Sequence, residues 1–147
     1  MTRSSTRREF RAILCGALAA LVAAGLVGCS RGETGPATLD GTQWRLVGWS
    51  FTAFASTDFA FTAVFEDGQV SGTAAVNSYG APYTTGPDDA FSVGDIIATE
   101  MAGSRRAMQA EAAYFELLRS AASYAHEGGT LTLYGADGGE ALVFAAL

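Results

Sequence analysis

The sequence is poor in the side chains that most often build reactive or metal-binding sites. Its 147 residues include two cysteines, one histidine and no lysine, so that all nine basic residues are arginine. Cys15 lies inside an N-terminal apolar run, which leaves Cys29 as the only thiol beyond that run. One histidine without thiolate partners cannot build a zinc site, and one cysteine cannot close a disulfide within a domain. The stability of the folded part must therefore come from packing.

Long hydrophobic runs are also missing, with one exception near the N-terminus. Residues 12–27 form an apolar stretch that follows four arginines and ends at Gly28-Cys29. As a helix this stretch would rise only about 24 Å, which is short for a membrane span. The pattern predicts a lipoprotein-type signal peptide over residues 1–28, with a fatty acid such as palmitate attached to Cys29. The alternative is an uncleaved anchor that happens to end in cysteine.

The basic segment before the apolar run carries a second export signal. Thr6-Arg7-Arg8-Glu9-Phe10 resembles the twin-arginine motif, in which paired arginines are followed after one residue by a bulky apolar side chain. General secretion remains the alternative route. Both routes lead to the extracytoplasmic face of the cell membrane, and the sequence does not distinguish an inner from an outer membrane.

The charge balance of the chain changes once the signal is removed. The first 28 residues hold four arginines and one glutamate, so the remainder has five basic and 14 acidic residues, a net charge of −9. Such a surface repels nucleic acids and anionic lipid headgroups. We therefore expect no nucleic-acid partner, and attachment to the membrane through the lipid on Cys29 alone.

A small polar stretch separates Cys29 from the first strand pattern. Residues 29–38 predict a flexible tether, and residues 39–147 predict one folded domain. Alternating apolar and polar residues predict strands at 42–49, 59–65 and 70–74, the last two joined by a turn at 66–69. Residues 77–89 contain Asn, Gly, Pro and Asp and predict a loop, followed by a strand at 90–99.

The second half of the domain has one helical pattern. Over residues 104–122, Ser104 is placed as an N-cap and apolar residues recur at steps of three and four, which predicts an amphipathic helix. The predicted apolar stripe is Met108, Ala112, Phe115, Leu118 and Ala122, widened by Tyr114, Leu117 and Ala121. Strands at 130–134 and 140–145 then predict a C-terminal hairpin. This order favours a β-rich α+β fold, an antiparallel sheet or partly closed β-barrel with one covering helix.

Four segments in order resemble the META/HslJ domain. Leu39–Leu46 is similar to the opening L-x-G-T-x-W-x-L of that family, and Gly68–Gly72 with Asn77, Tyr79 and Tyr83 is similar to its G-x-v-s-G…N-x-Y-x-x-x-Y stretch. Residues 96–102 are similar to its "ia-s-T-x-M-a" segment, and the helix and C-terminal hairpin follow in the family's order. The resemblance implies a small envelope-associated β-rich domain, often a lipoprotein, linked in some members to stress or drug tolerance.

The chain departs from the family at two cysteines. Ala75-Val76 stands where the family usually has Gly-Cys, and Gly103 stands where it often has Cys after Met-Ala. The loss of both together is expected if the two positions face each other, because one cysteine alone would be an idle thiol. The resemblance implies no catalytic residues, and the missing cysteines leave no redox role.

The residues themselves offer little for catalysis. His126 precedes Glu127 and a Gly-Gly pair, and we expect it in a solvated turn after the helix rather than as a general base or ligand. Asp88-Asp89 follows a proline and is expected in a solvated turn rather than in a cation site. No Ser lies in a G-x-S-x-G elbow, and the glycine pairs lack phosphate-loop spacing. We expect no enzyme, no cofactor and no metal.

Binding is the function that remains. Trp49, Phe51, Phe54, Tyr79 and Tyr83 are expected to fill the core, with an exposed aromatic binding cluster as the alternative. Asn77 is expected to fix a loop through backbone hydrogen bonds, and Asn77, Tyr79 and Tyr83 are the candidate loop or ligand contacts. The sequence thus predicts a monomeric, lipid-anchored, non-catalytic domain that binds an envelope protein or small ligand, or that maintains the envelope under stress. A small hydrolase or ligand-processing enzyme, and an inhibitor or partner of another envelope protein, are the alternatives.

Overall fold

The computed structural model describes residues 38–147. The signal peptide, the twin-arginine motif, Cys29 and nearly all of the predicted tether lie outside these residues. Within residues 38–147 the chain forms nine strands and one α-helix, together with two 3₁₀ turns, η1 (Ser56–Asp58) and η2 (Pro87–Asp89). The larger elements are β1 (Thr42–Trp49), β2 (Thr62–Glu66), β3 (Gln69–Ala74), β4 (Asn77–Thr85), β5 (Phe91–Val93), β6 (Ile97–Ala98), α1 (Arg105–Ser120), β7 (Ala121–Glu127), β8 (Thr130–Gly135) and β9 (Glu140–Ala146).

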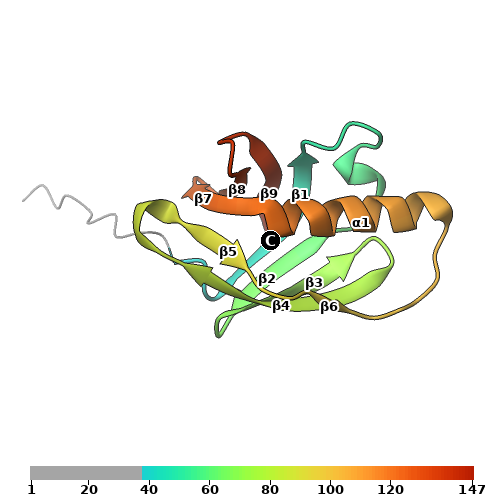
Figure 1. Ribbon diagram of the computed structural model, residues 1–147, viewed down its shortest axis with the longest axis horizontal. Helices are drawn as coiled ribbons and strands as arrows, with labels where there is room; N and C mark the ends of the chain where they lie inside the picture. Colours follow the sequence, from blue (N-terminus) through green and yellow to red (C-terminus); the bar gives the residue numbers. More distant parts are fainter. Residues whose placement is uncertain (1–37) are drawn as a thin grey trace, which may run out of the picture. The chain divides into compact units, whose positions relative to one another are not determined.

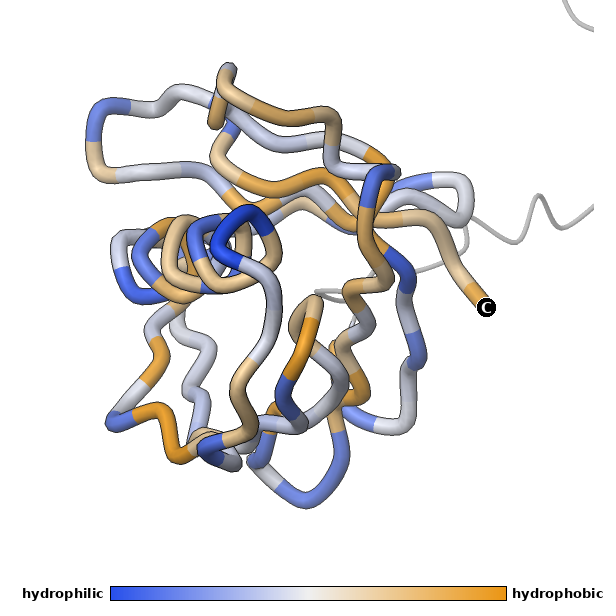
Figure 2. The backbone as a smooth tube through the Cα atoms, turned by 90° about the vertical axis from the view of Figure 1, so that its right-hand side faces the viewer, coloured by the Kyte–Doolittle hydropathy of each residue, from blue (hydrophilic) through white to orange (hydrophobic). Residues whose placement is uncertain are grey.

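The strands form one curved antiparallel sheet that is nearly closed. Its order is β5-β4-β3-β2-β1-β9-β8-β7, and β6 pairs with the first part of β4. A single bridge between Ala90 and Ser123 connects the two edges, next to β5 and within β7. In Figures 1 and 2, α1 lies between β7, β8 and β9 on one side and β3, β4 and β6 on the other. The predicted fold class, a β-rich barrel-like sheet with one covering helix, is confirmed.

The core consists of the side chains that point inward from alternate positions of the strands and of those on the buried face of the helix. In β1, Trp44 and Leu46 point inward, each at most 3% exposed, as their alternation predicts. Phe61, Ala63 and Phe65 line the same interior from β2 and the residue before it. The turn between β2 and β3 places Asp67 and Gly68 at positive φ, the geometry of a two-residue hairpin turn. Both strands of this hairpin are confirmed, although β2 begins at Thr62 and not at Phe59 as predicted.

The helix begins as predicted, but its buried face is rotated from the predicted one. Ser104 is the N-cap, and its Oγ accepts a hydrogen bond from the backbone N–H of Ala107 at 3.2 Å. Phe115 and Leu118 are buried, whereas Met108, Ala112 and Ala122 are exposed. The residues of α1 that are buried are Ala107, Ala110, Glu111, Tyr114, Phe115 and Leu118. The prediction missed this phase because alanine is too common along the helix to mark one face.

The prediction of a loop over residues 77–89 was wrong for residues 77–85 and holds only for residues 86–89. Residues 77–85 form β4, which pairs with β3 along the whole hairpin from Gln69↔Pro82 to Ala74↔Asn77. Asn77, Tyr79 and Ala81 alternate into the core, so the two-residue period is present. This period was missed because Gly80 and Pro82 have low intrinsic strand propensity. Pairing with β3 overrides that propensity in the folded domain.

Two further strand predictions need correction. The strand expected over 90–99 is split into β5 and β6, with the break at residues 94–96. The helix ends at Ser120 and the chain passes directly into β7, which the sequence analysis did not predict, so three strands follow the helix instead of two. His126 therefore lies inside β7 and not in a turn. The strands expected at 130–134 and 140–145 are confirmed as β8 and β9.

Gly72 marks a close approach between β3 and β2 that admits no side chain. A Cβ atom at this position would lie 2.1 Å from the carbonyl oxygen of Thr62, which also accepts a hydrogen bond from the Tyr79 hydroxyl. We expect Gly72→Ala to lower the free energy of unfolding by about 3 kcal/mol, because backbone atoms must move to admit the methyl group. Urea denaturation of the variant and the parent measures this difference.

Gly80 supplies the matched control in the neighbouring strand. Its nearest neighbour would lie 4.0 Å from an added Cβ, so Gly80→Ala meets no clash and should stay within about 1 kcal/mol of the parent. Equal effects of the two substitutions would contradict the close approach at Gly72.

Among residues 38–147, no helix is both long and apolar enough to cross a membrane.

Candidate functional site

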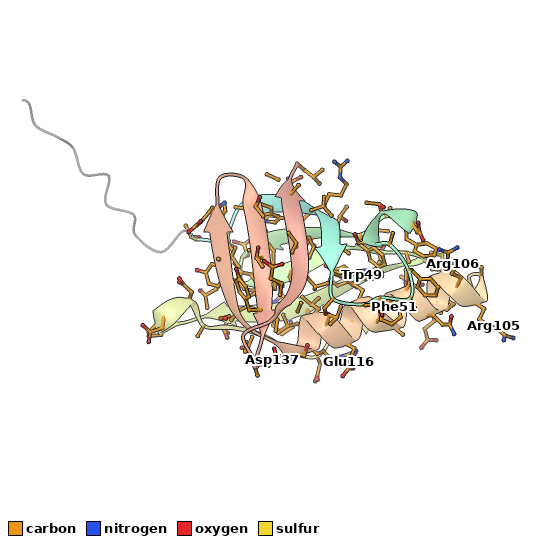
Figure 3. All side chains as sticks on the ribbon, turned by 90° about the horizontal axis from the view of Figure 1, so that it is seen from above. Trp49, Phe51, Arg105, Arg106, Glu116 and Asp137 are labelled. Carbon is orange, nitrogen blue, oxygen red and sulfur yellow. The ribbon has the colours of Figure 1, made fainter. Side chains whose placement is uncertain are left out.

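The connection between β1 and β2 brings several aromatic side chains to the surface. Trp49, Phe51, Phe54 and Phe59 are each half-buried, and the rings of Trp49 and Phe59 pack against the buried ring of Phe61. The indole N–H of Trp49 donates a hydrogen bond to the carbonyl oxygen of Phe54 at 2.9 Å, which fixes the path of the loop. Figure 3 shows Trp49 and Phe51 alongside α1. A surface of fixed aromatic rings results.

The rings meet edge to face. The planes of Trp49 and Phe51 are inclined at 84° with centroids 5.5 Å apart, and those of Phe54 and Phe59 at 85° with centroids 6.4 Å apart. Phe51 and Phe54 join the two pairs at 5.6 Å and 58°. Edge-to-face packing is the geometry that aromatic pairs prefer. The four rings therefore hold one another in place but offer no flat, coplanar platform.

An arginine from the helix completes this surface. The guanidinium carbon of Arg106 lies 4.9 Å from the ring centroid of Phe54 and 5.9 Å from that of Phe59. Arg106 also forms an ion pair with Asp58 of η1, which ties the aromatic loop to the first turn of α1. Cation–π contacts of this kind are worth about 0.5–1 kcal/mol at exposed sites.

A shallow groove of about 280 Å³ continues the surface onto β1. Arg45, Leu46, Val47, Thr57 and Phe59 line it. We refer to Arg45, Trp49, Phe51, Phe54, Phe59 and Arg106 as the aromatic–arginine surface. Aromatic and arginine side chains dominate binding energy where proteins associate.

The five aromatic residues expected to fill the core thus differ in how deeply they are buried. Tyr79 is 5% exposed and belongs to the core, and Tyr83 packs against Phe65 and Phe91 at its edge. Trp49, Phe51 and Phe54 are half-buried: Trp49 and Phe54 pack against the core, and part of each of the three rings stays at the surface. They fit neither the filled core that was expected nor a fully exposed cluster. The sequence feature that sets two of them apart from core residues is their position. Phe51 and Phe54 lie beyond the end of the alternating strand pattern, among Ser, Thr and Ala.

The tyrosines at the centre of the domain hydrogen-bond each other. The hydroxyl groups of Tyr79 and Tyr114 lie 2.7 Å apart, and the Tyr79 hydroxyl donates to the carbonyl oxygen of Thr62 at 3.0 Å. Burial raises the pKa of both phenols well above the ordinary value, and for Tyr114 the neighbouring Tyr79 raises it further. Both tyrosines therefore remain neutral at physiological pH and act as structural hydrogen-bonding groups.

Asn77 lies at the centre of a second buried network, with Glu111 of α1. One carboxylate oxygen of Glu111 accepts the backbone N–H groups of Asn77 at 2.8 Å and Val76 at 3.2 Å, and the other accepts the Asn77 side-chain amide at 2.7 Å. The Asn77 side-chain oxygen accepts the Thr99 hydroxyl at 2.7 Å and the Met101 N–H at 2.8 Å. This network joins the turn before β4, the segment after β6 and the helix.

The three candidate contact residues from the sequence are therefore placed as follows. Asn77 fixes the segment before α1 through the backbone of Met101, as expected, and Tyr79 uses its hydroxyl internally. Tyr83 is half-buried near Asp40. Two effects raise the pKa of its phenol: burial, which is the larger, and the nearby negative charge of the Asp40 carboxylate. Ligand contact at these residues remains a prediction.

Val76 and Gly103 face each other across this network. A Cβ atom on Gly103 would lie 3.4 Å from the Cβ of Val76 and 2.5 Å from its Cγ2. Disulfide-bonded cysteines have Cβ atoms about 3.5–4.5 Å apart. The two positions where the resemblance implied cysteines are thus adjacent in space, as their joint replacement suggested.

The residues considered as candidates for catalysis or metal binding do not come together in one site. His126 packs edge-on against the ring of Trp44, with centroids 5.0 Å apart, and lines a groove of about 380 Å³ that contains no carboxylate side chain. Asp88 and Asp89 are exposed in η2, each with φ near +56°. Within residues 38–147, no three His, Cys, Asp or Glu side chains are grouped so that they could hold a metal ion.

Comparison with known proteins agrees with this geometry. The META domain family model matches residues 37–146, which is most of the chain. The chain belongs to the META domain family. No curated protein matches it.

Solved structures share the fold of this META domain. One is the NMR structure of a protein from Burkholderia xenovorans, with 24% identity, a TM-score of 0.61, and coverage of 74% of this chain and 83% of that one. Another is the crystal structure of a DUF4847 family protein from Bacteroides vulgatus, with 14% identity, a TM-score of 0.56, and coverage of 73% and 93%. At these identities the likeness concerns the fold alone. Family and fold together indicate a small β-rich META domain.

Proposed function

We propose that this META domain is a monomeric, lipid-anchored binding domain on the extracytoplasmic face of the membrane, and that it binds another envelope protein. The aromatic–arginine surface carries the proposal. Its rings stay partly exposed on a domain whose core is already filled by the aromatic side chains of Trp44, Phe61 and Tyr114, each at most 1% exposed. Aromatic clusters that remain partly exposed at a surface, beside arginine, mark interaction sites.

The rigidity of the surface supports binding without a large entropic cost. The Trp49–Phe54 hydrogen bond and the Asp58–Arg106 ion pair hold the loop before any partner arrives. A preorganised surface loses less conformational entropy on association than a mobile one. The core beneath the rings is tightly packed and leaves no room for a small ligand to enter the domain. This favours a partner that binds across the surface.

Affinity purification of the lipidated protein from its own membranes tests the binding role. We expect a protein that co-purifies with the parent chain and is lost from the Phe51→Ala, Phe54→Ala variant. Thr130→Ala on β8, whose side chain is exposed, is the control and should retain the partner. Identical co-purifying proteins for all three chains, or none, would reject the proposal.

The anchor is tested separately at Cys29. We expect a Cys29→Ala chain to lose labelling by a fatty-acid probe and to move from the membrane fraction to the soluble fraction, because the lipid is its only proposed attachment. Two or three acyl chains are needed for firm attachment, since a single myristoyl-length chain binds only marginally. A Cys29→Ala protein that still fractionates with membranes, unlabelled, would instead support the uncleaved anchor.

A further inference from the structure

The charges of the domain are distributed unevenly. Residues 38–147 contain 13 acidic residues and only four arginines. Two of these arginines, Arg45 and Arg106, belong to the aromatic–arginine surface, and Arg105 is next to it at the start of α1. Figure 3 shows Arg105 and Arg106 at the same end of the helix. An acidic domain thus places two of its four arginines against its partly exposed aromatic rings, and a third at the neighbouring position of the helix.

Two of these arginines have no ionic partner in the fold. Within residues 38–147, the only ion pair joins Arg106 to Asp58, so the exposed Arg45 and Arg105 are unpaired. Arg105 and Arg106 also occupy the first turn of α1, which has no acidic residue. Positive charge is unfavourable there because it opposes the positive end of the helix dipole. Arg106 offsets this cost through Asp58, Phe54 and Phe59, but the stability of the domain does not explain the placement of Arg105.

The arrangement of the rings limits what can bind. At angles of 84° and 85° the rings present edges as well as faces to the solvent instead of one flat face. Such a surface suits protruding apolar side chains better than the face of a sugar ring. Exposed Val47 extends the apolar area into the groove beside Arg45.

We infer that the aromatic–arginine surface binds an acidic segment of a second protein, one that carries apolar side chains between its carboxylates. This inference rests on the proposed function and specifies the partner's chemistry. The apolar side chains of the segment pack against the rings of Phe51, Phe54 and Phe59, and its carboxylates pair with Arg45 and Arg105. The net negative charge of the rest of the domain repels acidic segments from every other face.

Site-specific photocrosslinking in the full, lipidated chain tests this inference. A benzoylphenylalanine in place of Phe51 should crosslink to one protein, and mass spectrometry should locate the crosslink in a segment with net negative charge and apolar residues. The same probe in place of Tyr134, on the groove of β7 and β8, is the control and should give no such product.

Charge variants separate local pairing from general repulsion. Arg45→Gln with Arg105→Gln removes two positive charges beside the rings and should reduce the crosslink from position 51 by about tenfold. Thr130→Glu with Ala136→Glu changes the net charge by the same amount at exposed positions of β8 and the turn that follows it, and should leave the yield within about twofold. Arg105→Gln relieves an unfavourable helix-dipole contact, so unfolding does not account for the loss.

The outcomes distinguish this inference from the function on which it rests. A crosslink from position 51 to a basic or uncharged segment, to lipid or to a second copy of this chain would overturn the inference. So would equal losses for the two charge variants. A protein captured from position 134 but not from position 51 would preserve a binding role and reject this surface, and no protein captured from either position would reject both.

Discussion

Oxidation of a Val76→Cys, Gly103→Cys chain should form a disulfide and raise the free energy of unfolding by about 3.5 kcal/mol over the reduced form. This value is the loop-closure entropy of a cross-link that spans roughly 28 residues. The geometry favours it, because a Cβ on Gly103 would lie 3.4 Å from the Cβ of Val76. The measurement is urea unfolding of the oxidised and reduced protein, in a chain in which Cys15 and Cys29 are serine.

Single substitutions provide the controls for this prediction. Gly103→Ala alone should destabilise by about 1–3 kcal/mol, because its methyl group would lie 2.5 Å from Cγ2 of Val76. Adding Val76→Ala should restore part of that loss, since it removes the clashing atoms. Free thiols that persist in the double-cysteine chain under oxidising conditions would show that the two positions do not face each other in solution.

The disulfide prediction also bears on how this chain differs from its family. The geometry that suits a cysteine pair is retained, while the residues are a branched apolar side chain and a glycine. Val76 occupies the space that a side chain at position 103 would need. The contact between the turn before β4 and the segment before α1 is thus kept by packing and by the Asn77 network, without a covalent bond.

The sequence predicted those elements whose local signals agree with the tertiary structure. The alternation of 42–49, the Asp67-Gly68 turn and the Ser104 cap each gave the correct element, because period, turn and cap are local properties. Strand β4 was missed, since its Gly80 and Pro82 favour a loop and only pairing with β3 makes them extended. Strand β7 was missed because it follows the helix with no turn residue between them.

The candidate surface was predictable only in part. Aromatic residues beyond the end of a strand pattern raised the possibility of an exposed cluster, but not the contribution of Arg106, which is more than fifty residues further along the chain. The Glu111 network was not anticipated, because the predicted stripe correctly held Tyr114, Phe115 and Leu118 but extended to Met108 and Ala112 in its first half. Glu111 lies one turn before Tyr114 and Phe115, so it falls on the face that is buried.

Glu111 should be among the most sensitive positions in the domain. It is 5% exposed, and its carboxylate accepts three hydrogen bonds, from the N–H groups of Val76 and Asn77 and from the Asn77 amide. Glu111→Ala leaves these donors without a partner and opens a cavity between α1 and β4. We expect a loss of about 3–5 kcal/mol in the free energy of unfolding, measured by urea denaturation.

A graded series separates the hydrogen bonds from the volume of the side chain. Glu111→Gln keeps the shape and one acceptor oxygen but turns a second donor toward the Asn77 amide, so it should cost less, about 1–2 kcal/mol. Glu116→Ala, on the exposed face of the same helix, should change stability by about 0.5 kcal/mol or less. If Glu111→Ala and Glu116→Ala were equally mild, the carboxylate would not be what joins the helix to the turn before β4. The expected order reflects the asymmetry of buried hydrogen bonds: an acceptor adds little beyond what water provides, but its removal leaves several donors that water cannot reach.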